Sequence, residues 1–297
     1  MIQRAKTYLK LIRIHQSVKN GFVLLPIFFG KRFTDPHVLG LALLAALAFY
    51  LTSASIYVLN DLRDVAEDRL HPKKRFRPIA SGAVGEREAV ALALCCLGAA
   101  ALLGALLGPA FLGVLGGYLA LNLAYSLKLK QLAIVDIMCI AVGFVLRVFA
   151  GGVATDTRIS HWIVLMTFLL ALFLALAKRR DDLLLTEDGA AVRKSIHGYN
   201  REFVDASMMI MAAVTIVSYV LYTVTPEVMA SFSSDDIYLT TFWVILGILR
   251  YLQRTFVDKD SGSPTTMLLE DRLLQLSIIG WLASFAFIIY FHTVRPG

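Results

Sequence analysis

Long apolar stretches recur along the chain, and short segments with charged residues, glycine or proline separate them. Most of these stretches approach the 20 or so residues that an α-helix needs to cross a bilayer. The pattern therefore predicts an all-α polytopic membrane protein with nine transmembrane helices in one bundle, a single domain over residues 1–297. The expected helices are residues 16–33, 38–60, 87–107, 109–126, 132–151, 160–178, 204–224, 237–254 and 272–293. Gly108-Pro109 predicts a tight turn between the third and the fourth.

The composition agrees with a membrane protein. Hydrophobic residues make up 58% of the chain, and the mean hydropathy is +0.68. A soluble protein of this length would be nearer half apolar. The net charge of +7 does not indicate nucleic acid, because the basic residues lie in loops between apolar stretches. We expect the membrane as a partner and no nucleic acid.

The basic residues also predict the orientation. If the N-terminus is cytoplasmic, nearly all lysines and arginines fall in cytoplasmic loops, as the positive-inside rule requires. The outer loops then hold only Lys31, Arg32, Arg158 and Arg295. The charge-rich loops would open onto one cytoplasmic mouth. This one-sided arrangement favours an enzyme over a lipid or ion transporter, which needs access from both sides, or over a purely structural bundle.

An acidic cluster at the end of the second expected helix is the main candidate for chemistry. Asp61, Asp64 and Asp68 have i, i+3, i+7 spacing, which places three carboxylates on one helical face, and Asn60 joins that face. Such carboxylates would repel one another without a cation. Mg²⁺ binds one or two carboxylates together with substrate phosphate oxygens, so the cluster predicts a magnesium site.

A basic segment follows the aspartates at once and includes Lys73, Arg75 and Arg77. Lysine and arginine bind phosphate oxygens, and arginine can do so with two parallel hydrogen bonds. Metal-binding acids beside phosphate-binding bases predict a site for a diphosphate. The alternative is a solvated, charged loop with no ligand.

A second charged segment ends the expected helix 160–178. It contains Lys178, Arg179 and Asp182, and Lys194 follows in the same loop. Mixed charges could hold a metal ion and also reach additional phosphate oxygens. The alternative is a set of salt-bridged basic residues that anchors the helix at the cytoplasmic surface.

Two further groups lie near or inside expected helices. Tyr125 and Lys128 follow the fourth helix and could bind a phosphate or extend to lipid headgroups. Lys19, Asn20 and Arg147 lie inside expected membrane helices, where polar and ionisable residues are functional candidates. They could meet an anionic lipid headgroup at membrane depth.

These features together resemble the UbiA-type superfamily of membrane prenyltransferases. The resemblance rests on Asn60-Asp-x-x-Asp64-x-x-x-Asp68, on Arg-Pro-x-x-Ser-Gly at 77–82, on Tyr-Ser at 125–126 and on the nine helices. A more specific resemblance is to the branch of decaprenyl-phosphate phosphoribosyltransferases. It rests on Arg13, Gln16, Lys19-Asn20, residues 71–78, Leu146-Arg147-x-x-Ala150-Gly-Gly and Ala177-Lys-Arg-Arg. That branch attaches phosphoribose to a polyprenyl phosphate and supplies the arabinose donor for cell-wall arabinan.

The resemblance implies a multi-pass enzyme of a bacterial inner membrane that can form homo-oligomers. It implies Mg²⁺-dependent transfer of 5-phosphoribosyl from phosphoribosyl diphosphate to a polyprenyl phosphate. Asp61, Asp64 and Asp68 would hold the metal, Lys178 and Arg179 the 5-phosphate, and Lys19, Asn20 and Arg147 the lipid phosphate. The alternative within the superfamily is an aromatic prenyltransferase that uses a polyprenyl diphosphate, as in quinone synthesis.

Overall fold

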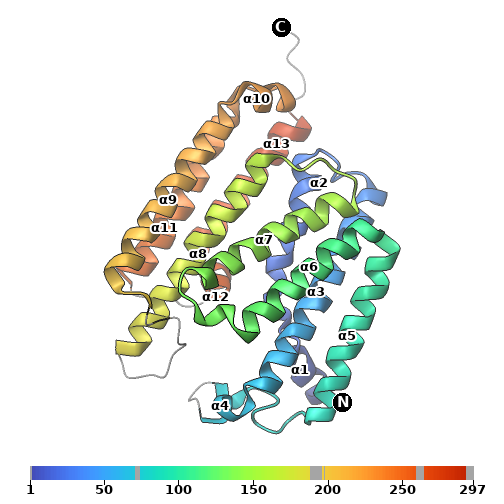
Figure 1. Cartoon of the computed structure of the whole chain (residues 1–297). Coiled ribbons are helices and arrows are strands. Elements are labelled where there is room, and N and C mark those ends of the chain that lie inside the picture. The colour runs from blue at the N-terminus through green and yellow to red at the C-terminus, as the bar shows by residue number, and fades with distance from the viewer. Residues whose placement is uncertain (1, 71–73, 188–195, 197, 259–263, 292–297) are drawn as a thin grey trace. The chain divides into compact units, whose positions relative to one another are not determined.

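The computed structural model describes residues 2–70, 74–187, 196, 198–258 and 264–291 (Figure 1). The regular elements in these ranges are α-helices and short 3-10 helices, which confirms the all-α prediction. The chain forms two compact units. The first comprises residues 1–129 and 142–163, and the second comprises residues 130–141 and 164–297, so α7 and α8 contribute to both.

The first unit is built on the long helix α3, which packs against α5. Its core gathers Phe49 of α3, Phe111 and Tyr118 of α6, and small residues such as Ala100 and Ala150, all buried. Its helices, with the full bounds of α7, are α1 (Ile2–Leu11), η1 (Ile14–Leu24), α2 (Leu25–Phe29), α3 (Pro36–Arg63), α4 (Val65–Leu70), η2 (Lys74–Phe76), α5 (Glu86–Leu107), α6 (Pro109–Leu127) and α7 (Val135–Ala154).

Local sequence signals define the helix ends in this unit. Asp35 caps α3 by accepting hydrogen bonds from the backbone N–H groups of His37 and Val38, and Pro36 occupies the first turn. Gly108 separates α5 from α6 with φ of 101°, a conformation that side chains other than glycine avoid. The tight turn expected between the third and fourth helices is thereby confirmed.

The second unit is held together partly by buried ion pairs. Arg180 donates to Asp205 of α9 at 2.8 Å and to the carbonyl of Thr255 in α11 at 2.8 Å, and so joins three helices. The elements of this unit, with α8 in full, are η3 (Leu129–Gln131), α8 (His161–Glu187), α9 (Arg201–Thr223), α10 (Pro226–Phe232), η5 (Asp236–Thr240), α11 (Thr241–Phe256), α12 (Pro264–Glu270) and α13 (Arg272–Phe291).

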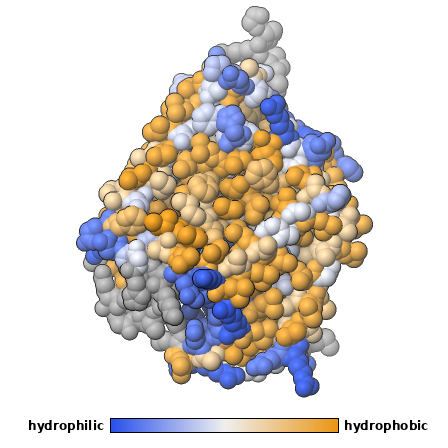
Figure 2. Space-filling view, viewed as in Figure 1, coloured by the Kyte–Doolittle hydropathy of each residue, from blue (hydrophilic) through white to orange (hydrophobic). Residues whose placement is uncertain are grey.

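Seven helices in the described ranges are long and apolar enough to cross a membrane: α3, α5, α6, α7, α8, α9 and α13. An eighth crossing is added if α10 and η5–α11, bent by 94°, count as one span. Large apolar side chains are exposed on these helices, including Leu102 and Leu106 of α5 and Ile210 and Val217 of α9. Apolar residues also dominate the face shown in Figure 2. The protein is therefore a multi-pass membrane protein.

The first expected helix, residues 16–33, differs from the prediction. The chain there forms η1 and then the five-residue helix α2, and neither qualifies as a span. Asn20 supplies a physical reason, because its side chain is buried and accepts a hydrogen bond from Arg147 rather than facing lipid. Pro26 lies in the first turn of α2 and lacks the N–H that a continuous helix would use.

Candidate active site

The acidic cluster lies at a break between two helices. Helix α3 ends at Arg63 and α4 begins at Val65, with Asp64 between them at φ −93° and ψ 12°. Hydrogen bonds of the i to i+4 type cross the break, from Asp64 N to Asn60 O at 2.9 Å and from Asp68 N to Asp64 O at 2.8 Å. The break therefore preserves most of the helical spacing. Asp61 and Asp68 are buried, whereas Asn60 and Asp64 are half-buried.

Two arginines compensate the charge of these aspartates. Nη1 of Arg77 lies 3.0 Å from Oδ1 of Asp61 and 2.7 Å from Oδ2 of Asp68. Nη2 of Arg13 lies 2.5 Å from the same oxygen of Asp61. Arg77 was predicted as a site residue, and the structure joins it to the aspartates. Arg13 was not, although its left-handed backbone (φ 51°), where α1 gives way to η1, marks an unusual position.

The residues present fit a magnesium ion in their chemistry. Two carboxylates converge on a single cationic nitrogen of Arg77, so both can reach one cation, and carboxylate oxygens are the ligands that Mg²⁺ prefers. Across the described part of the chain, no group of three or more acidic, histidine or cysteine side chains is gathered closely enough to hold a metal. In this structure Arg77, rather than a metal ion, is the cation that Asp61 and Asp68 share.

The C-terminal end of α6 lies beside this cluster. Nη1 of Arg63 donates to the carbonyl of Ser126 at 2.9 Å, which joins the end of α3 to residues 125–128. Tyr125 is half-buried and Lys128 is exposed. Arg75 is also exposed, and its guanidinium lies 4.8 Å from the ring centre of Phe76. Lys73 and Lys194 lie outside the described residues.

Arg147 lies at the centre of a buried polar network in the first unit. It donates to the side-chain oxygen of Asn20 at 3.1 Å, to the carbonyl of Gly143 at 2.7 Å and to the hydroxyl of Tyr118 at 2.8 Å. The Tyr118 hydroxyl also bonds to Ser53 at 2.9 Å. These partners are neutral, so they do not cancel the positive charge. Lys19, adjacent to Asn20, is half-buried. The structure brings Asn20 and Arg147 into contact. Sequence analysis missed Tyr118 and Ser53.

The second unit contains the other predicted charged segment. Arg179 is fully buried and forms ion pairs with Asp136 of α7 and with Asp182 one turn later in α8. Lys178 beside it is exposed. Tyr199 donates to Asp136 at 2.6 Å. Burial, followed by this hydrogen bond, raises the pKa of Tyr199 above its usual range. Sequence analysis missed Asp136 and Tyr199, and no local pattern pairs them with Arg179.

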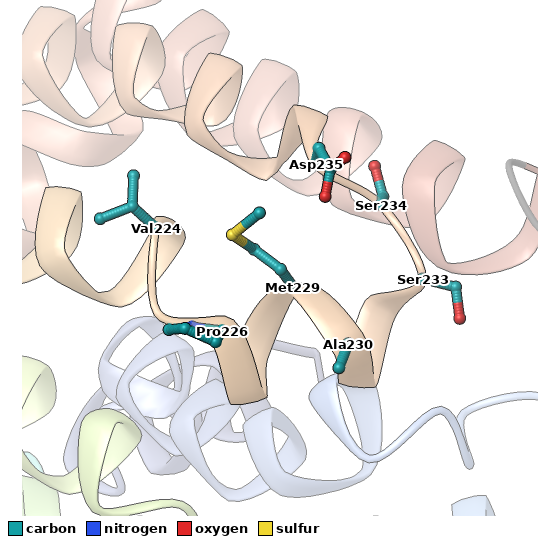
Figure 3. Close-up of a pocket in the computed structure, with 7 residues that line it drawn as sticks. All are labelled: Val224, Pro226, Met229, Ala230, Ser233, Ser234 and Asp235. Carbon is teal, nitrogen blue, oxygen red and sulfur yellow. The ribbon is translucent and has the colours of Figure 1, made fainter.

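A separate pocket in the second unit contains none of the predicted residues. It lies where α9 passes into α10, and Val224, Pro226 and Met229 contribute to its lining (Figure 3). Arg201 and Asp205 mark the opposite end of α9, and 23 helical residues span roughly 33 Å. The pocket is therefore remote from the Arg180–Asp205 end of this unit.

Fold and site together define a polytopic membrane protein with an acidic and basic cluster at a helix break. The model of the UbiA prenyltransferase family matches residues 21–278, and the chain belongs to that family. The match confirms the resemblance inferred from the aspartate spacing.

Relatives and solved structures agree with this assignment. The chain is 36% identical over 284 residues to a decaprenyl-phosphate phosphoribosyltransferase of Mycobacterium tuberculosis, covering 93% of this chain and 91% of that protein. A protein of the same name from Mycolicibacterium smegmatis is 33% identical over 297 residues, with 95% and 92% covered. A UbiA homolog from Archaeoglobus fulgidus, solved bound to DMAPP and Mg²⁺, has a TM-score of 0.70 at 20% identity, with 96% and 99% covered, and supports the fold.

Proposed function

We propose that this protein transfers 5-phosphoribosyl from phosphoribosyl diphosphate to a polyprenyl phosphate and releases diphosphate. The observation that carries the proposal is the 33–36% identity, over more than 90% of the chain, to proteins named decaprenyl-phosphate phosphoribosyltransferase. The exposed Lys178 in the second charged segment adds support, because this donor has a 5-phosphate besides its diphosphate. The polyprenyl length and a role in arabinan synthesis remain predictions.

We also propose the finer topology expected from the sequence: nine crossings in one domain, a cytoplasmic N-terminus and a cytoplasmic site in a bacterial inner membrane. The bent pair α10 and η5–α11 would supply one crossing, and η1 with α2 would supply the ninth. The family match from residue 21 to residue 278 runs through both compact units and supports a single functional domain. Homo-oligomer formation stays a prediction.

Asp61, Asp64 and Asp68 would hold Mg²⁺, which when bound neutralises charge on the leaving diphosphate. Arg77 already touches two of these carboxylates and would share in binding the diphosphate, with Lys73 and Arg75 from the same segment. Asn60 would orient a ligand or bind a ribose hydroxyl. These roles suit a site in which acids and bases must both be close to one diphosphate.

The second charged segment would serve the 5-phosphate. Lys178 is exposed and can reach an anion, and Lys194 is proposed from the sequence. Arg179 was predicted to contact the phosphate directly. Its burial and its pairing with Asp136 and Asp182 favour an indirect role, through the position of Asp182.

Arg147 would provide the positive charge for the lipid phosphate, with Lys19 and Asn20 beside it in the chain fold. Its hydrogen-bond partners are neutral oxygens, so its charge can still attract an anion. Tyr125 and Lys128 would assist in binding the lipid phosphate, and the contact of Arg63 with Ser126 places their segment beside the aspartate cluster. An ionisable group at membrane depth that lacks a carboxylate partner among its hydrogen bonds is well suited to a charged headgroup.

The chemistry requires no protein base. The broken bond lies at an anomeric carbon, so an oxocarbenium-like transition state is expected, as in glycosyl transfer. The nucleophile is a phosphate monoester oxygen, and the second pKa of such a phosphate is about 6. It is therefore largely dianionic at neutral pH. An aromatic acceptor would instead need a proton removed from its ring.

The alternative is an aromatic prenyltransferase that uses a polyprenyl diphosphate, which the aspartate cluster would serve equally well. A transporter is the alternative from a different class. The decisive test compares two reactions of the purified protein with Mg²⁺. The first contains radiolabelled phosphoribosyl diphosphate and polyprenyl phosphate, and the second contains polyprenyl diphosphate and 4-hydroxybenzoate. We expect labelled lipid in the first reaction and no product in the second. The reverse pattern would support the aromatic prenyltransferase. No product in either reaction would favour the transporter.

The same assay tests the metal site. Asp64→Ala should abolish Mg²⁺-dependent turnover with little loss of folded protein, because Asp64 is half-buried and its removal leaves Arg77 on the two buried aspartates. A variant that stays active would contradict the proposed metal site.

A further inference from the structure

The second unit contains a chain of contacts that passes from a buried tyrosine to a partly exposed carboxylate. Tyr199 donates to Oδ1 of Asp136 at 2.6 Å. Oδ2 of Asp136 lies 3.1 Å from Nε of Arg179, whose Nη1 in turn donates to Oδ2 of Asp182. The side chains of Asp136 and Arg179 are fully buried, but that of Asp182 is 19% exposed. Of these four side chains, Asp182 can be reached by a ligand in solution and Arg179 cannot.

The two carboxylates explain how the charged side chain of Arg179 can be fully buried. One guanidinium is shared by two carboxylates, and a buried charge without its partners would be strongly destabilising. Oδ1 of Asp136 also accepts the backbone N–H of Ile137 at 2.9 Å. Hydrogen bonds therefore hold Asp136 through Oδ1, while Oδ2 faces Arg179 as its ion-pair partner.

Tyr199 connects these ion pairs to the start of α7. Its hydroxyl accepts the backbone N–H of Ile134 at 2.7 Å while donating to Asp136. Ile134 has φ of 69°, a conformation that is unfavourable for a β-branched residue and persists only where surrounding contacts impose it. Gly198 contributes to the same packing, because a Cβ atom there would collide with Ala133. The tyrosine thus fastens the start of α7 in a strained geometry directly before Asp136.

We propose that Tyr199, acting through Asp136 and Arg179, is a positioning residue that orients Asp182 to accept a hydrogen bond from a ribose hydroxyl of the phosphorylated donor. This inference rests on the proposed function for the identity of the donor. The hydroxyl of Tyr199 joins the strained Ile134 to the buried ion pairs. Partners one step removed from a ligand-binding group commonly matter for affinity, because they fix its orientation.

The test compares Tyr199→Phe with Tyr219→Phe. Tyr219 is a matched control because its buried hydroxyl likewise makes two hydrogen bonds in the same unit, one with the Thr240 hydroxyl and one accepted from the Trp281 ring N–H. We expect Tyr199→Phe to raise KM for phosphoribosyl diphosphate roughly tenfold to a hundredfold, with KM for polyprenyl phosphate unchanged. Tyr219→Phe should lower the thermal midpoint and leave both KM values unchanged. Equal effects of the two substitutions on KM would overturn the proposal.

A double-mutant cycle with Asp182→Asn separates positioning from general destabilisation. If Tyr199 acts through Asp182, then Tyr199→Phe should add little to the KM of the Asp182→Asn protein, whereas independent effects would add. The same cycle can be read from protection against thermal unfolding by ribose 5-phosphate, which offers the 5-phosphate and the ribose hydroxyls without the diphosphate. If the wild-type protein transfers prenyl groups and ribose 5-phosphate does not protect it, the proposed function and this inference fail together. If ribose 5-phosphate protects it, additivity in the protection assay would overturn the network by itself.

Discussion

Nη1 of Arg77 lies 2.7 Å from the carboxylate of Asp68, and this contact links the basic segment to the acidic helix end. The same nitrogen is 3.0 Å from Asp61, so one guanidinium serves two buried carboxylates. A divalent cation can serve the same two groups. The arrangement therefore predicts that Arg77 and Mg²⁺ both neutralise the negative charge of Asp61 and Asp68.

Arg77→Ala should lower stability by about 1–3 kcal/mol, because buried carboxylates lose a charged hydrogen-bond partner. Added Mg²⁺ should then raise the thermal midpoint more in the variant than in the wild-type protein. Arg75→Ala is the control, since Arg75 is exposed and packs over Phe76. Equal stabilisation of all three proteins by Mg²⁺ would contradict the shared role.

Arg147→Met should raise KM for polyprenyl phosphate by about tenfold to a hundredfold, the effect of losing a charged hydrogen bond. KM for phosphoribosyl diphosphate should not change. Arg32→Met is a matched control, because Arg32 also donates to neutral oxygens, the carbonyls of Thr155 and Asp156. If both variants weaken lipid use equally, Arg147 has no specific role with the lipid phosphate.

Stability should depend on pH through Asp271, which joins α13 to α11. The hydrogen bond from Arg250 lowers the pKa of Asp271, and Arg250 bonds to both of its oxygens. A carboxyl with a lowered pKa in the folded protein stabilises it above the unfolded value of about 3.9 and loses this contribution as pH falls below that value. The difference in thermal midpoint between wild type and Asp271→Asn should be constant at neutral pH and shrink below about pH 4. A difference that is the same at every pH would exclude ionisation as its cause.

Gly151→Ala should destabilise the first unit, because a Cβ atom at this position would collide with the backbone carbonyl of Val23 in η1. Overpacking of this kind costs about 1–3 kcal/mol. Gly113→Ala in α6 is the matched control, since an added Cβ meets nothing within 4 Å there and alanine favours the helix. Thermal unfolding of the two variants in detergent measures the contrast. Equal midpoints would mean that η1 can move away from α7.

Local patterns in the sequence were enough to predict the fold class and most of the membrane-spanning helices. Apolar length predicted the helices that became α3, α5 to α9 and α13, and Gly108 with Pro109 predicted the turn between two of them. The spacing of Asp61, Asp64 and Asp68 led to the family that the comparison shows. These features depend on neighbours within a few turns of helix, so the chain order alone contains them.

Tertiary structure decided which charges meet. Arg13 and Asp61 are 48 residues apart, and Tyr199 and Asp136 are 63 apart, so no periodicity relates them. It also turned residues 14–29 into η1 and α2, because Asn20 bonds to Arg147 across 127 residues of sequence. Arg179 looked available for phosphate in the sequence, but packing buried it between Asp136 and Asp182. Burial removes charges from water, so each must find a partner that only the folded chain brings near.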